Sequence, residues 1–105
     1  MGIPSSLLKA ASPSIPTSCN SKAFTTNTTI GTALDLSGSV GRFVTFYGTA
    51  DFRLKAGKDD AVAATAGDFP HKADLAHPYQ IKADGKYVSV RGIGAGDLFY
   101  AITDS

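Results

Sequence analysis

The sequence predicts an all-β protein, a single small β-sandwich (jelly-roll-like or Ig-like) of six to eight short antiparallel strands with an extended N-terminal arm. Three observations predict this class. From Lys22 onward, apolar and polar residues alternate with a period of two, which is typical of half-buried strands. Turn signals rich in Gly, Asp and Pro recur at short intervals. The chain has 105 residues, which is room for one such domain.

Residues 1–22 are expected to form the arm, and residues 23–105 the sandwich. The first segment holds three of the five prolines and six serines, a composition that interrupts regular structure and buries little. One or two helical turns could form around Leu7 and Leu8, but so short a helix is marginal unless something packs on it. We therefore expect the arm to contact a neighbouring subunit.

The first strands of the sandwich are predicted from their alternation. In TIGTALDLS, Ile30, Leu34 and Leu36 share one face, and Gly38 ends the run. The segment 41–49, GRFVTFYGT, is rich in aromatic and β-branched residues and is apolar on both faces. Because a small domain cannot bury both faces of such a strand by itself, we expect another chain to cover the outer one.

The next strand, DFRLKAG, alternates most cleanly, with Phe52 and Leu54 on one face and charged residues on the other. Residues 58–76 show no sustained period and are expected to form a long loop. A short edge strand is expected within this loop, around residues 61–65.

The C-terminal part of the chain contains the strongest turn signal. HPYQIKA is expected to be an edge strand because Pro78 lacks a backbone N–H. Asp84-Gly85 favours a two-residue hairpin, whose central positions need positive φ, and would join this strand to KYVSVRGI. The last strand, LFYAITD, places three large side chains on one face and Phe99 on the other: Leu98, Tyr100 and Ile102.

Composition and charge argue against several classes of function. Ten Lys and Arg residues nearly balance nine Asp and Glu, so we expect no nucleic-acid partner. No stretch approaches the roughly 20 apolar residues that cross a bilayer, and the first ten residues lack the features of a signal peptide. We expect a protein made in the cytoplasm, with no membrane partner. The single cysteine, Cys19, allows no intramolecular disulfide.

The residues that carry chemistry do not form a recognisable active site. The glycines from Gly92 to Gly96 follow a strand but precede a strand-like segment, whereas a phosphate-binding loop opens a helix, so we expect a turn or β-bulge. His71 and His77 lie in the long loop, where we expect them to be solvated, since zinc needs about four ligands. No serine stands in a strand-turn-helix elbow. We expect no catalytic residues, no metal and no cofactor.

Four features follow one another between Arg42 and Ile102: the strand region GRFVTFYGTADFRLKAG, the loop AVAATAGDFP, the polar strand PYQIKA and the closing pair KYVSVRGIGAGDLFYAI. This order resembles small proteins encoded among the head genes of tailed bacteriophages, which share a β-sandwich core and decorate, cement or join the shell. The Ser/Pro/Thr-rich arm is similar to the extended arms by which such proteins clamp neighbouring capsid subunits.

The resemblance implies a non-enzymatic virion structural protein, a capsid decoration (cement) protein on the capsid surface. Its partners would be the major capsid protein, whose shell it binds and stabilises, and neighbouring copies of itself, with a homo-oligomer on the capsid left open. We expect the contacts to come from the arm and from outward aromatic residues: Ile3, Leu7, Leu8, Ile15, Phe43 and Tyr47.

Two alternatives remain open. One is a different part of the particle, either a head-to-tail joining protein or a fibre-associated protein. The other is a small carbohydrate-binding module, because β-sandwiches can use exposed aromatic rings as stacking platforms. The candidate platforms are Tyr47, Tyr79, Tyr87 and Phe99.

Overall fold

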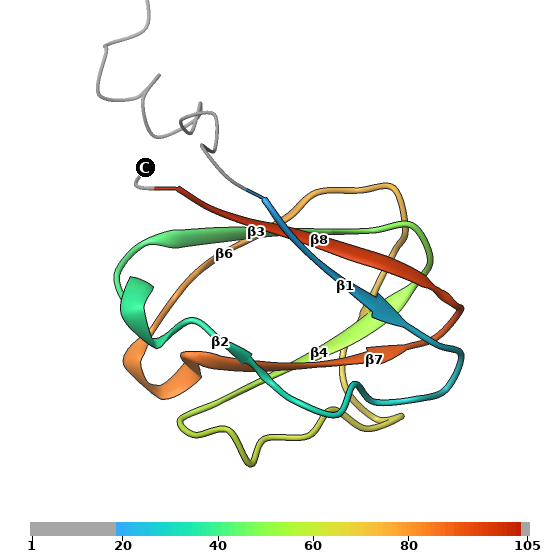
Figure 1. Cartoon of the computed structure of the whole chain (residues 1–105), viewed down its shortest axis with the longest axis horizontal. Helices are drawn as coiled ribbons and strands as arrows, with labels where there is room; N and C mark the ends of the chain where they lie inside the picture. Colours follow the sequence, from blue (N-terminus) through green and yellow to red (C-terminus); the bar gives the residue numbers. More distant parts are fainter. Residues whose placement is uncertain (1–18, 104–105) are drawn as a thin grey trace, which may run out of the picture.

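The computed structural model describes residues 19–103 as two four-stranded antiparallel sheets packed face to face (Figure 1). Sheet A contains, in spatial order, β1 (Asn20–Phe24), β8 (Gly96–Thr103), β3 (Phe43–Gly48) and β6 (His77–Gln80). Sheet B contains β2 (Leu34–Asp35), β7 (Tyr87–Gly92), β4 (Phe52–Gly57) and β5 (Pro70–His71). Two short 3-10 helices, η1 (Ser37–Ser39) and η2 (Ala83–Gly85), lie in the connections. The predicted all-β sandwich is confirmed.

The strand order is that of a jelly roll rather than an Ig domain. The pairs β1–β8, β2–β7, β3–β6 and β4–β5 are nested, as they are when one long hairpin wraps around a barrel. Pairs β3–β8 and β4–β7 then join these hairpin pairs into the two sheets. Of the two sandwich types that the sequence left open, the structure has the first.

Strand β1 begins before the expected end of the arm. Asn20, Ser21 and Lys22 pair with β8, opposite Tyr100, Phe99 and Leu98, so they belong to the sandwich and not to the arm. These three residues are exposed because β1 lies at the edge of sheet A, which explains why they show no apolar alternation. The expected arm contacts lie outside the described residues: Ile3, Leu7, Leu8 and Ile15.

The predicted alternation builds the core between the sheets. In β3, Val44 and Phe46 point inward; in β8, Leu98 does so, with Tyr100 and Ile102 partly buried beside it. The buried residues form one cluster drawn from both sheets: Phe24, Leu34, Leu36, Val44, Phe46, Phe52, Ile81, Val88, Val90 and Leu98. Burying apolar surface between two sheets is the main stabilising contribution in a sandwich of this size.

The predicted hairpin at Asp84-Gly85 is wrong. Strand β6 pairs with β3 in sheet A, whereas β7 lies in sheet B, so the segment between them crosses from one sheet to the other. It does so through η2, in which neither Asp84 nor Gly85 has the positive φ that a two-residue hairpin turn needs. A turn signal between two alternating segments does not say whether they pair.

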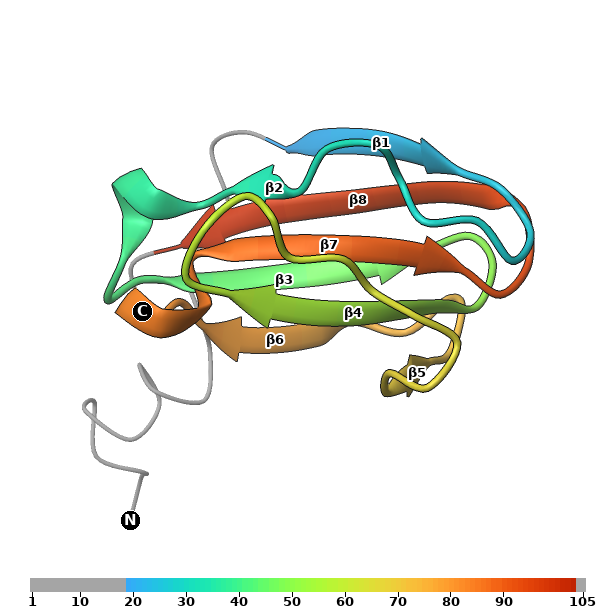
Figure 2. The same ribbon diagram turned by 90° about the horizontal axis from the view of Figure 1, so that it is seen from below.

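The bounds of the long loop agree with the prediction, but the position of the short strand within it does not. Residues 61–65 are not a strand, and the edge strand is instead β5, which pairs with Phe52 and Arg53 of β4. The loop before β5 crosses the outer face of sheet B, where Figure 2 shows it in yellow-green in front of β7 and β4. Ala64 of this loop contacts the outer face of sheet B at Ser89 and is buried there.

Candidate functional site

An aromatic face, defined here as Phe43, Tyr47 and Phe99, lies on the outside of sheet A. Tyr47 of β3 is the direct cross-strand partner of Phe99 in β8, so the two side chains leave the sheet on the same side. The exposed fractions are 36% for Phe43 and 38% for each of the other two side chains. These are large apolar groups held in contact with water.

Small side chains lie between the rings of the aromatic face, and one hydrogen bond holds Tyr47. Ala101 and Thr103 of β8 lie on the same side and are buried, which leaves the rings as the outermost groups. The hydroxyl of Tyr47 donates to Oδ1 of Asp74 over 3.0 Å. This hydrogen bond raises the pKa of Tyr47 further above its ordinary value of 10.0, which already lies well above physiological pH, so the phenol is neutral.

The outer face of sheet B, by contrast, is covered by the chain's own loop. The backbone N–H of Ala64 donates to Oγ of Ser89 over 2.8 Å, and Ser89 is 1% exposed. The guanidinium of Arg53 donates to the carbonyl oxygen of Asp68 over 2.6 Å. Only sheet A therefore presents a broad uncovered face among the described residues.

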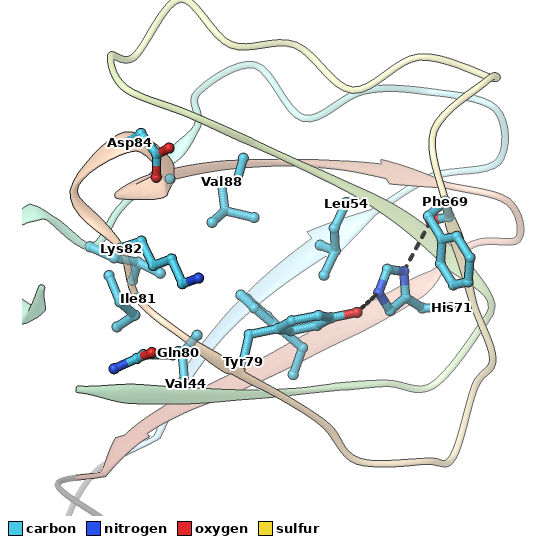
Figure 3. Close-up of a pocket in the computed structure, with 14 residues that line it drawn as sticks. Val44, Leu54, Phe69, His71, Tyr79, Gln80, Ile81, Lys82, Asp84 and Val88 are labelled. Carbon is cyan, nitrogen blue, oxygen red and sulfur yellow. Dashed lines mark hydrogen bonds between the residues drawn. The ribbon is translucent and has the colours of Figure 1, made fainter. Parts of the chain in front are cut away.

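A cleft of about 660 Å³ opens between the two sheets on the side of β4 and β6 (Figure 3). It exists because β5 pairs only with the first two residues of β4, which leaves Leu54 to Gly57 without a neighbour on that edge. Its lining is mostly apolar and comes from both sheets and from η2: Leu36, Val44, Phe46, Leu54, Ala56, Phe69, His71, Tyr79, Gln80, Ile81, Lys82, Asp84, Gly85 and Val88.

His71 closes one end of the cleft, and its predicted solvation is wrong. Its ring is 4% exposed and stacks on Phe52, with 5.2 Å between ring centroids. Nδ1 lies 3.0 Å from the carbonyl oxygen of Phe69 and Nε2 lies 2.5 Å from the hydroxyl of Tyr79, as the dashed lines in Figure 3 show. Strand β5 has only two residues, Pro70 and His71, which are too few to show any period in the sequence.

The hydrogen bonds of His71 fix its tautomer. A carbonyl oxygen can only accept, so Nδ1 carries the proton that is donated to Phe69, and Nε2 of the neutral ring accepts from Tyr79. Burial, and secondarily the nearby His77, lower the pKa of His71, while the Phe69 carbonyl opposes this shift. Burial also raises the pKa of Tyr79. Both groups are therefore neutral near pH 7.

The glycine-rich segment is a turn, as predicted. Strand β7 ends at Gly92 and β8 begins at Gly96. The backbone N–H groups of Ile93 and Gly94 both donate to the carbonyl oxygen of Asp51, over 2.9 and 3.1 Å. Since these donors are already used, the turn cannot offer them to a phosphate.

Residues 19–103 contain no cluster of three or more His, Cys, Asp or Glu side chains placed to hold a metal ion. In the same part of the chain, no helix has the length and hydrophobicity needed to span a membrane. His77 uses Nε2 to contact the carbonyl oxygen of Lys72 at 2.9 Å.

The structure brings together some of the aromatic residues that the sequence singled out and separates others. Phe43, Tyr47 and Phe99 share the outside of sheet A. Tyr79 faces the cleft, and Tyr87 lies half-buried on the other sheet, so neither joins them. The cleft itself was not predicted, because it depends on how far β5 extends along β4.

The sequence matches no protein-family model, and neither the curated proteins nor the solved structures contain a match to it.

Proposed function

We propose that this protein is a non-enzymatic structural module of a tailed-bacteriophage particle, a capsid decoration protein that binds the major capsid protein at the capsid surface. The observation that carries the proposal is the uncovered aromatic face of sheet A, opposite a sheet whose outer face is covered. Uncovered aromatic side chains on one face favour a protein partner.

Two further features support the proposed role in capsid decoration. The segment from Arg42 to Ile102 resembles phage head proteins, and it supplies the two central strands of sheet A, β3 and β8. The jelly roll is a fold that viral capsid proteins use, although the fold alone assigns no function. Decoration of a shell needs a stable sandwich and a docking face, and it needs no catalytic group.

Copy number in purified particles tests the proposal and separates it from a joining protein. Quantitative mass spectrometry of particles of the virus that encodes the chain should find on the order of hundreds of copies, as the symmetry of a shell requires. About a dozen copies would indicate a head-to-tail ring instead. Absence from the particle would contradict both assignments.

A carbohydrate-binding module is the second candidate, and the pairing of Tyr47 with Phe99 favours it. Two adjacent rings on one face offer a stacking platform, and the carboxylate of Asp74 at Tyr47 offers a hydrogen-bond acceptor. Lectin domains also use the jelly roll. Binding to a defined sugar on a glycan array, lost in Tyr47→Ala, would support this function over capsid decoration.

A further inference from the structure

We propose that the cleft between the sheets binds an amphiphile, a molecule with an aliphatic chain and a terminal carboxylate. The site is separate from the aromatic face, so it does not depend on the proposed function. The aliphatic chain would lie along the cleft, over the core side chains that form its floor, and the carboxylate would lie at the η2 end, beside Lys82.

The interior of the cleft favours an aliphatic ligand. Its volume of about 660 Å³ lies within the range of small-molecule sites. The floor of the cleft is mainly aliphatic: Val44, Ile81 and Val88, which belong to the buried core, and the half-buried Leu54, all labelled in Figure 3. A polar ligand group placed among them would lose its water without gaining a hydrogen bond.

The polar groups at the β5 end are not available to a ligand. His71 uses both ring nitrogens, one on Phe69 and one on the hydroxyl of Tyr79. Among the described residues, no buried side-chain polar atom lacks a hydrogen-bond partner. A ligand that reaches this end must therefore be apolar there, which places its polar group at the opposite end.

The η2 end carries one positive and one negative side chain, Lys82 and Asp84, and we assign the ligand a carboxylate because Lys82 is the one directed along the cleft. Lys82 forms no ion pair with a described residue, and Figure 3 shows its ammonium group directed along the cleft, between Gln80 and Val88. Asp84 stands at the same end and also lacks an ion pair with a described residue. A carboxylate is attracted by Lys82 and repelled by Asp84, so the two residues should act on it with opposite sign.

The test uses the full chain at pH 8, with decanoate below its micelle-forming concentration and decanol as the uncharged probe. Methyl-detected NMR should show shifts at Leu54, Ile81 and Val88 that saturate. Lys82→Gln should weaken decanoate binding about fivefold, and Asp84→Asn should strengthen it by a similar factor, as single exposed charge pairs do. Neither variant should change decanol binding.

A pair of variants on strand β4 distinguishes binding in the cleft from binding to the outer surface of sheet B. Ala56 lines the cleft, whereas its neighbour Lys55 points to the other side of sheet B. Ala56→Phe should abolish binding of both probes, the smaller Ala56→Leu should weaken it, and Lys55→Phe should leave it unchanged. NMR spectra of each variant report whether it is folded.

Three results would overturn the proposal. The first is the absence of saturable shifts at millimolar decanoate. The second is equal weakening by Ala56→Leu and Lys55→Phe. The third is decanoate binding that Lys82→Gln and Asp84→Asn leave unchanged, because the cleft would then recognise the aliphatic chain and not the carboxylate.

Discussion

The hydroxyl of Tyr79 donates a hydrogen bond to Nε2 of His71 over 2.5 Å and thereby ties β6, at the edge of sheet A, to β5, at the edge of sheet B. This is a direct polar link between the two sheets on the open side of the sandwich. Tyr79→Phe leaves the nitrogen of a buried ring without a partner, so we expect it to lower the free energy of unfolding by about 1 to 2 kcal/mol. Urea denaturation measures the difference.

Tyr87→Phe is the matched control for this variant. Its hydroxyl forms no hydrogen bond with a described residue, so its loss should change the free energy of unfolding by less than about 0.5 kcal/mol. Equal effects of the two variants would show that the Tyr79–His71 link does not stabilise the fold.

The buried His71 predicts a loss of stability in mild acid. Its pKa is lowered in the folded protein from the ordinary value of 6.5, mainly by burial. Between the folded and unfolded pKa values the unfolded chain binds more protons, so the free energy of unfolding falls as the pH drops through about 6.5 and is fully regained about one unit above it. Urea denaturation at pH values from about 7.5 to 5.5 measures this change. This window lies above the pH range in which carboxylates titrate, so they do not contribute to it.

His71→Gln separates this effect from the overall cost of losing the ring. The variant should be less stable at every pH, because it loses the stacking on Phe52, but its stability should vary less with pH in the same window. An unchanged pH dependence would show that His71 is not the group that titrates in this window.

Gly92 is predicted to be intolerant of any side chain. A Cβ at this position would collide with the carbonyl oxygen of Thr25 and lie 2.8 Å from the ring of Phe24. Because backbone cannot move aside cheaply, Gly92→Ala should lower the free energy of unfolding by about 3 kcal/mol. Gly31→Ala, where nothing lies within 4 Å of the new Cβ, should stay within about 0.5 kcal/mol. Thermal denaturation of both variants checks the contrast, and similar losses would contradict the packing of β1 against β7.

The strands that carry most of the core could be predicted from the sequence. Phe52 and Leu54 in β4, and Leu98, Tyr100 and Ile102 in β8, turn to the side that their alternation predicted. Alternation is a local property of one strand with one buried face, so one sequence is enough to find it.

The arrangement of the strands could not be predicted in the same way. Asp84-Gly85 has the composition of a hairpin turn, yet it carries the chain between sheets, because pairing depends on contacts far away in the sequence. His71 lies in a two-residue strand, too short for any period, and its burial comes from Phe52 and Tyr79. The cleft follows from the same short strand and was missed for the same reason.

The aromatic face is predicted to lose its partner when it is made charged. Tyr47→Asp with Phe99→Asp would place two carboxylates at the centre of the proposed contact, where aromatic residues typically carry much of the binding energy. We expect docking to weaken at least about thirtyfold, equivalent to about 2 kcal/mol. Both side chains are more than a third exposed in the free protein, so the fold should tolerate the change, at a cost of up to about 1 kcal/mol for two carboxylates placed directly opposite each other.

The most direct test of this account is the number of copies bound per particle for three forms of the full chain: the wild type, the Tyr47→Asp/Phe99→Asp variant, and Lys55→Asp on the outside of sheet B. Quantitative mass spectrometry of particles purified at equal protein concentration gives each number. If the aromatic face docks on the shell, the wild type and Lys55→Asp bind equally and the double variant is lost from the particle. Full occupancy by the double variant would contradict a docking role for the aromatic face.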